Sequence, residues 1–266
     1  MSIYDVIIIG GGPAGLSAAI SARQRNRGVA VISNDASGSG LYKARHIGNY
    51  PGVPDVSGPE LLAKLSSHAE SAGADLIIGR VYSVLPADGI FHVGYGTDIL
   101  SSRCVILATG VAQASVFPGE GELLGSGVSY CATCDGMLFR GKRVCVVCLS
   151  PEARGEADYL ASIGCDVVRL DTKDISILGE GRVAAVVADG TEIECEGVFI
   201  LRRAIAPDLL IANLEMADGH IKVGVSGETS IHGVFAAGDC AGAPYQIAKA
   251  AGQGQVAALS ADSYLM

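Results

Sequence analysis

Continuous apolar runs bounded by glycine mark the buried strands at the start of the chain. Val6 to Ile9 is uninterrupted and β-branched, and the next such run is Val29 to Ile32. Runs of this length and composition are typical of strands that are covered on both faces of a parallel sheet. The Ala-rich segment from Leu16 to Arg27 predicts a helix between them, which completes a βαβ unit of about 30 residues.

The pattern changes in the next part of the chain. Helical spacing extends from Pro59 to Gly73, with proline near its start and glycine at its end. Alternation from Arg80 to Leu107 predicts a small antiparallel sheet with a turn near Asp88-Gly89. The run from Val105 to Gly110 then predicts a strand that ends in a sharp turn.

A second βαβ unit begins at Arg143. It has a strand from Val144 to Val147, a helix from Pro151 to Ile163 and a strand from Asp166 to Leu170. With an offset of 138 residues this unit aligns with the first, so that Gly10 corresponds to Cys148 and Gly12 to Ser150. We therefore predict an α/β fold with two Rossmann-like domains of the dinucleotide-binding type, each a three-layer ββα architecture.

The end of the chain returns to the first domain. A strand from Gly233 to Ala237, a Gly238-Asp239 turn and a long helix of small residues follow one another. We expect one domain over residues 1–114 and 215–266, with the second domain, residues 115–214, inserted in it.

Composition restricts the class of protein. With 49% hydrophobic and 18% charged residues, the chain is typical of soluble globular proteins. A net charge of −9 and the absence of Trp argue against nucleic-acid binding. The first apolar run is too short for a signal peptide and none is long enough to span a membrane, so we expect a cytoplasmic protein. Its eight cysteines are then expected to be mostly reduced and buried, and any disulfide to be catalytic.

The first βα turn carries a dinucleotide-binding pattern. Gly10-x-Gly12-x-x-Gly15 lies directly between a buried strand and a helix, which is the context that supports the motif. Ser33, Asn34 or Asp35 is in place to bind a ribose, and none of the three stands out. Two later turns, Ala108-Thr109-Gly110 and Gly238-Asp239, are consistent with FAD rather than NAD, although Asp239 alone would suit a simple N-cap.

A dithiol motif follows in the middle of the chain. Cys131-x-x-Cys134 is a CxxC motif, and the five histidines have no ligand-like spacing to it, so zinc is disfavoured. Two residues of separation suit a redox dithiol at a turn or helix start, where the thiolate is stabilised. Asp135 follows directly and is a candidate acid/base; a plain N-cap is the alternative.

These motifs resemble those of the low-molecular-weight thioredoxin reductases. The resemblance rests on Gly127 to Gly136, which includes Cys-Ala-Thr-Cys-Asp-Gly, and on four further segments: Asn49 to Gly52, Ala108 to Gly110, Pro118 to Glu120 and Gly233 to Asp239. It implies an FAD domain interrupted by a smaller pyridine-nucleotide-type domain that bears the dithiol. It also implies a homodimer that reduces thioredoxin or a thioredoxin-like disulfide.

The resemblance also implies roles for single residues. Cys134 would face the flavin, Cys131 would attack the partner disulfide, and Asp135 would be the acid/base. Tyr245 replaces an arginine of the family and could lie against the flavin. The implied FAD contacts are Gly10, Gly12, Pro13, Ala14, Gly15, Asn34, Asn49, Thr109, Gly110, Gly238, Asp239, Tyr245, Gln246 and Ile247.

The second nucleotide site departs from the family. Cys148-Leu149-Ser150 replaces three glycines, and Asp171-Thr172-Lys173 replaces the basic stretch that grips a 2′-phosphate. About 27 residues separate Leu170 from the strand Val198 to Leu201, and a hairpin around Asp189-Gly190 leaves no room for another crossover helix. This pattern resembles the ferredoxin-dependent flavin thioredoxin reductases.

Alternative functions with other electron donors and acceptors stay open. An NAD(P)H-dependent thioredoxin reductase, a dithiol oxidase and a flavin-bearing redox sensor are the alternatives. Because ferredoxins are acidic and this chain is at −9, docking of ferredoxin needs a local basic patch. The candidate patches are Arg23, Arg25 and Arg27; Lys43 and Arg45; and Arg140, Lys142 and Arg143.

Overall fold

The chain forms two compact units, of which one is inserted in the other. The computed structural model describes residues 3–34, 36, 39–110, 117–130, 132–148, 153–201 and 206–266, and the side chains of residues 133 and 134 lie outside this description. The first unit is Met1–Gln113 with Ala206–Met266, and the second is Ala114–Ile205. The chain rejoins the first unit nine residues earlier than residue 215, because the short helix α5 (Pro207–Leu210) packs beside strand β4.

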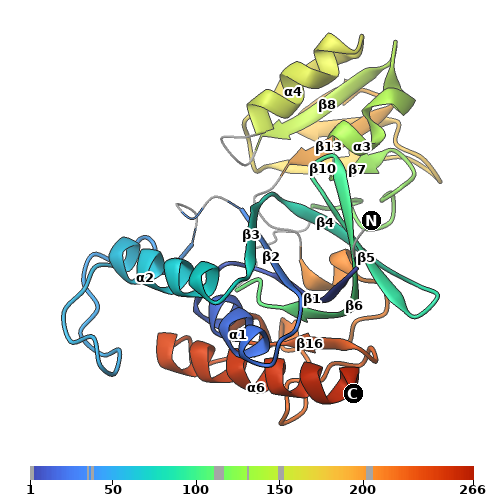
Figure 1. Cartoon of the computed structure of the whole chain (residues 1–266). Coiled ribbons are helices and arrows are strands. Elements are labelled where there is room, and N and C mark those ends of the chain that lie inside the picture. Colours follow the sequence, from blue (N-terminus) through green and yellow to red (C-terminus); the bar gives the residue numbers. More distant parts are fainter. Residues whose placement is uncertain are drawn as a thin grey trace. The chain divides into compact units, whose positions relative to one another are not determined.

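A seven-stranded sheet forms the centre of the first unit, in the order β3-β2-β1-β6-β5-β4 with β16 also paired to β6 (Figure 1). The strands are β1 (Tyr4–Ile9), β2 (Val29–Ser33), β3 (Asp75–Ile78), β4 (Val81–Ala87), β5 (Ile90–Tyr95), β6 (Asp98–Leu107) and β16 (Val234–Ala236). Strand β6 pairs antiparallel with β5 over its first half and parallel with β1 and β16 over its second. The carboxyl ends of β1, β6 and β16 therefore meet at one edge, which is where α/β sheets bind their ligands.

Three helices cover one face of this sheet (Figure 1): α1 (Pro13–Gln24), α2 (Gly58–Ser71) and α6 (Ile247–Leu265). Helix α1 begins and ends three residues before the predicted bounds, because Pro13 is tolerated at a helix start and Asn26 has a positive φ of 59°. Helices α1 and α6 approach closely through small residues, since a Cβ on Gly254 would lie 2.0 Å from the Ala14 carbonyl oxygen. Among the described residues no helix is long and apolar enough to cross a membrane.

The second unit has a parallel sheet in the order β7-β13-β8-β9 and an antiparallel sheet in the order β10-β11-β12. Its elements are β7 (Val128–Ser129), α3 (Ala132–Asp135), the 3-10 turn η2 (Gly136–Phe139), β8 (Arg143–Cys148), α4 (Ala153–Ser162), β9 (Asp166–Leu170), β10 (Ile175–Leu178), β11 (Ala185–Ala188), β12 (Thr191–Glu194) and β13 (Gly197–Leu201). Residues 171–196, all described, contain three strands and no helix. The predicted hairpin and the missing crossover helix are both confirmed.

Candidate functional site

The β1–α1 turn has the close backbone packing that a dinucleotide motif requires. Gly10 has a φ of +119°, and a Cβ on it would lie 2.1 Å from the Ala108 carbonyl oxygen. A Cβ on Gly15 would lie 1.9 Å from the Gly10 carbonyl oxygen, whereas one on Gly12 would meet no described atom within 4 Å. Gly10 and Gly15 are therefore packed against neighbouring backbone, and Gly12 leaves an open surface in front of the helix.

The N-terminus of α1 faces this open surface. Gly12 is the N-cap residue, no side chain caps the helix, and Pro13 occupies its first turn. The first backbone N–H groups of a helix lack intrahelical partners and carry the positive end of its dipole. The turn therefore suits a phosphate group. Ala14 is buried and packs between the Gly238-Asp239 turn and α6. A Cβ on Gly238 would lie 2.8 Å from the Ala14 Cβ.

Two buried polar atoms lie where β6 and β16 end. Thr109 Oγ1 and Asp239 Oδ1 have no hydrogen-bond partner among the described residues. A buried polar atom left unpaired costs about 1–3 kcal/mol, so these two atoms are suited to a bound ligand. Gly110, with a φ of +71°, follows Thr109 at the same edge, and a Cβ on it would meet no described atom.

The Asp239 side chain does not cap a helix, although its position in the sequence would suit an N-cap. Asp239 starts the short 3-10 helix η3 (Asp239–Ala241), whose N-cap residue is Gly238 with no side-chain cap. Burial raises the pKa of the Asp239 carboxyl, and the nearby Lys249 ammonium opposes that rise. Lys249 Nζ donates to the Gly238 carbonyl at 2.9 Å and also to that of Gly242, which ties η3 to the first turns of α6.

The segment before α6 joins the loop between β2 and α2. Asn49 Nδ2 donates to Gln246 Oε1 at 3.1 Å, and both residues are exposed. Ile247 packs against the small cluster of Ile47, Val56 and Leu61. The structure therefore brings Asn49 and Gln246 together as predicted, and it gives the Ile247 side chain a packing role. Asn34 follows β2 and is half-buried, while Asp35 lies outside the described residues.

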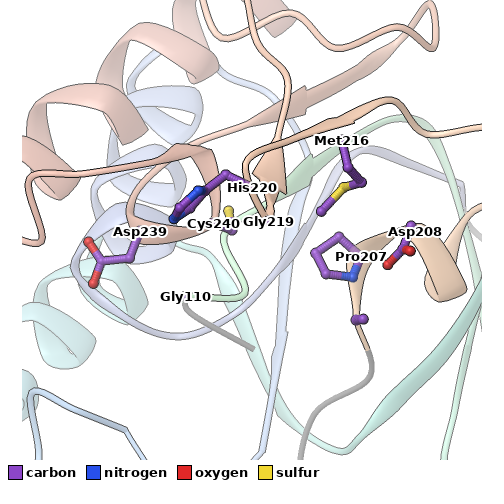
Figure 2. Close-up of a pocket in the computed structure, with 9 residues that line it drawn as sticks. Gly110, Pro207, Asp208, Met216, Gly219, His220, Asp239 and Cys240 are labelled. Carbon is purple, nitrogen blue, oxygen red and sulfur yellow. The ribbon is translucent and has the colours of Figure 1, made fainter. Parts of the chain in front are cut away.

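A cavity of about 200 Å³ opens beside these turns (Figure 2). Its lining is Gly110, Ala206, Pro207, Asp208, Met216, Gly219, His220, Asp239 and Cys240. The residues from Met216 to His220 belong to a hairpin of β14 (Met216–Ala217) and β15 (His220–Ile221). Sequence reasoning missed Asp208, Met216 and His220, because neither a short hairpin nor a four-residue helix carries a motif.

The dithiol is only partly within the described residues. Cys131 lies outside them, and Cys134 is described by its backbone in α3 without its side chain. Asp135 does not cap η2 through its side chain; instead Ser129 Oγ donates to Asp135 Oδ2 at 2.6 Å. Glu156 on α4 accepts the backbone N–H of Ala132 at 3.3 Å. The chain around the dithiol thus holds two carboxylates.

The segment Cys148-Leu149-Ser150, which aligns with the glycine turn of the first unit, is described up to Cys148, the last residue of β8. Leu149 and Ser150 lie outside the described residues. Burial raises the pKa of the Cys148 thiol, and the nearby Asp171 carboxylate raises it further. This end of β8 therefore holds a neutral thiol and an acid, neither of which favours a phosphate.

Six further cysteines of the described residues are free thiols: Cys104, Cys145, Cys148, Cys165, Cys195 and Cys240. All but Cys148 are buried. The prediction of reduced, buried thiols is confirmed for these six.

The structure gives hydrogen-bond or ion-pair partners to the arginines of the first candidate basic patch and to Arg143 of the third. Asp262 on α6 is 5% exposed and pairs with Arg27 at 2.6 Å and with Arg25 at 3.2 Å. Arg23 donates to two backbone carbonyls, and Arg143 pairs with Asp166 at 2.7 Å. Arg25 and Arg27 share the single Asp262 carboxylate, so part of the positive charge of the patch of Arg23, Arg25 and Arg27 is offset. Arg143 and Asp166 are 54% and 60% exposed and form a surface ion pair.

Two basic groups stay exposed. Lys43 and Arg45 are exposed on the loop between β2 and α2. Asn49 of the same loop is hydrogen-bonded to Gln246. In the second unit, Arg140 and Lys142 are exposed just after η2, and Lys142 also lies over the Phe139 ring at 5.5 Å.

Comparisons with known proteins agree with this architecture. A model of the pyridine nucleotide-disulphide oxidoreductase family matches residues 4–177 and 168–254. A thioredoxin reductase from Bacillus subtilis (strain 168) is 32% identical over 99% of this chain and 95% of its own length.

Solved structures are similar over the whole chain. A ferredoxin-flavin thioredoxin reductase from Clostridium acetobutylicum is 40% identical, with a TM-score of 0.90 over 100% of this chain and 98% of that one. A thioredoxin reductase from Gloeobacter violaceus is 31% identical, with a TM-score of 0.80 over 98% and 94% of the two chains.

Proposed function

The chain belongs to the pyridine nucleotide-disulphide oxidoreductase family, and we propose that it reduces thioredoxin with electrons taken from ferredoxin. One observation carries the choice of donor: the second unit lacks the crossover helix of a nucleotide-binding fold over residues 171–196. The 40% identity to a ferredoxin-flavin thioredoxin reductase over the entire chain supports the same choice.

FAD is the cofactor that we propose for the first unit. The unpaired Thr109 Oγ1 and Asp239 Oδ1 and the open surface before Gly12 fit its hydroxyl and phosphate groups. Asn49 and Gln246, with their exposed amides, would bind the ring. When bound, FAD accepts electrons singly and delivers them as a pair.

We propose that the dithiol carries the electrons onward. The Cys131 thiolate attacks one sulfur of the thioredoxin disulfide, and the bond between the two thioredoxin sulfurs breaks as a mixed disulfide forms. Cys134 then attacks Cys131, which releases reduced thioredoxin and leaves a Cys131–Cys134 disulfide for the next electron pair. Asp135, positioned by its hydrogen bond to Ser129, exchanges the proton of the leaving thiol.

A panel of donors tests the function. NADPH, NADH and reduced ferredoxin are each offered to the FAD-loaded protein under anaerobic conditions with oxidised thioredoxin present. We expect reduced ferredoxin to bleach the flavin absorbance and to produce thioredoxin thiols. Rapid bleaching by either pyridine nucleotide would contradict the proposed donor. Bleaching without thioredoxin thiols, or faster flavin turnover with oxygen and a small dithiol, would contradict the reductase itself.

Met137 and Leu138 are the apolar surface that we propose for thioredoxin. They follow the dithiol directly in η2 and are 56% and 69% exposed. Replacing both by alanine is expected to raise the KM for thioredoxin about tenfold, because docking would bury less apolar area. The matched control is Ile78→Ala with Leu85→Ala, two exposed apolar residues of the first unit. An unchanged KM in the Met137/Leu138 variant would refute this surface.

Lys43 and Arg45 are the basic surface that we propose for ferredoxin. Reversing both charges (Lys43→Glu with Arg45→Glu) is expected to raise the KM for ferredoxin about tenfold at low salt and to flatten its salt dependence. The same change of charge at two other exposed lysines, Lys64→Glu with Lys173→Glu, is the control. Equal effects of the two double variants would mean that only net charge matters and would rule out this loop as the docking surface.

A homodimer and a cytoplasmic location stay predictions. Sedimentation of the FAD-loaded protein over a range of concentrations measures the first.

A further inference from the structure

His220 and Tyr245 form a hydrogen-bonded pair at the pocket of the first unit. The Tyr245 hydroxyl lies 2.7 Å from His220 Nε2, and the two rings are tilted by 38° with centroids 5.9 Å apart. His220 lines the pocket, and Figure 2 shows its ring reaching from the hairpin to the part of the pocket that holds Cys240 and Asp239. The Tyr245 side is open to water, since this residue is 50% exposed. The pair therefore links the pocket to solvent.

The other titratable groups in the pocket are less suited to exchange a proton near neutral pH. Burial raises the pKa of the Cys240 thiol, which donates to the Leu107 and Ala237 carbonyls, so it stays protonated. Asp239 has a raised pKa with Lys249 beside it, and Asp208 lies on α5. Histidine is the side chain whose ordinary pKa, about 6.5, is closest to neutral.

Charges just outside the pocket are already paired. Lys249 donates to the Gly238 and Gly242 carbonyls, and burial lowers its pKa. Lys222 and Glu215, which flank the hairpin, form an ion pair of 2.8 Å on the exposed side. These charged groups therefore have partners other than the His220–Tyr245 pair.

We propose that the ring of the bound flavin borders this pocket, that His220 takes up one proton from solvent when that ring gains electrons, and that Tyr245 holds the His220 ring in place. The proposal rests on the proposed function, because a donor such as ferredoxin brings electrons without protons. The proton adds to Nε2, no bond between heavy atoms forms or breaks, and the Tyr245 oxygen changes from donor to acceptor of the same hydrogen bond. The positive imidazolium then offsets the negative charge that the electrons add to the pocket.

The variant His220→Gln separates proton uptake from structure. A glutamine side-chain oxygen can still accept the Tyr245 O–H, but it cannot take up a proton in this pH range. The flavin midpoint potential of the purified FAD-loaded protein is measured against pH from about 5.5 to 8.5, on either side of the ordinary histidine pKa. The reduced flavin ring itself exchanges a proton near neutral pH and gives one change of slope in both proteins. We expect the wild type to show an additional change of slope in this range that H220Q lacks. A wild-type curve that H220Q reproduces over the whole range would overturn the proposal.

A second variant keeps the proposal testable if H220Q does not bind flavin. Tyr245→Phe keeps the ring and removes the hydroxyl, so the additional change of slope should persist at a shifted pH. An unshifted additional change of slope in Y245F would overturn the role of Tyr245. Flavin content and melting temperature show whether each variant is folded. Because a chemical reductant sets the potential in these titrations, a failure of ferredoxin as donor would refute the proposed function without touching this result.

Discussion

Replacing Cys134 by serine is expected to leave FAD bound and to lower thioredoxin reduction by at least about 10³-fold. A serine hydroxyl is a poor nucleophile near neutral pH and forms no disulfide, so Cys131 could not be released from its mixed disulfide. The proposed FAD contacts all lie in the first unit, whereas Cys134 lies in helix α3 of the second. Loss of turnover with full flavin content is therefore the expected combination.

The measurement is thioredoxin turnover with reduced ferredoxin, together with the flavin absorbance spectrum of each variant. Cys148→Ser is the matched control, because Cys148 is a half-buried free thiol of the same unit that the proposed chemistry does not use. It should keep turnover within about twofold, as expected for a substitution away from the reacting groups. Sustained turnover by C134S would refute the assigned role.

Replacing Gly15 by alanine is expected to destabilise the first unit by about 3 kcal/mol or more. The new Cβ would lie 1.9 Å from the Gly10 carbonyl oxygen, and backbone cannot move aside as a flexible side chain can. The β1–α1 turn would have to open, and α1 would shift against α6. We expect a lower midpoint of denaturation by urea and a loss of bound FAD.

Gly12→Ala separates the fold from the ligand. A Cβ on Gly12 meets no described atom within 4 Å, so the variant should unfold at the same urea concentration as the wild type. The same methyl group would stand where the pyrophosphate of a bound dinucleotide approaches, and we expect at least about tenfold weaker FAD binding, or 1.4 kcal/mol. Fluorescence titration of the apoprotein with FAD measures this. Unchanged affinity in G12A would contradict the proposed cradle.

Local patterns predicted the elements of this fold well. Unbroken apolar runs become β1, β2, β8 and β13, and the glycine pattern after β1 becomes a turn with the expected close contacts. The missing crossover helix was also readable, since about 27 residues cannot hold a hairpin and a helix as well. Each of these inferences depends on residues that are near one another in the chain, where periodicity and turn chemistry act.

The bounds of α1 show where local reasoning is weakest. Apolar spacing does not report the end of a helix, whereas the N1 proline and the positive φ of Asn26 do. The partners of the first arginines could not be predicted, for a different reason. Arg27 and Asp262 are 235 residues apart, and only the packing of α1 on α6 places them 2.6 Å from each other.

The sequence by itself determined the two-unit α/β plan, the dinucleotide turn and the position of the dithiol, because these depend on short-range periodicity and on glycine and cysteine spacing. Tertiary structure alone decided which polar atoms of the described residues are buried without partners and which arginines form ion pairs. It also decided that the hairpin histidine, His220, meets Tyr245 at the pocket. Each of these features joins segments that are far apart along the chain or depends on burial from several sides, so no local pattern records it.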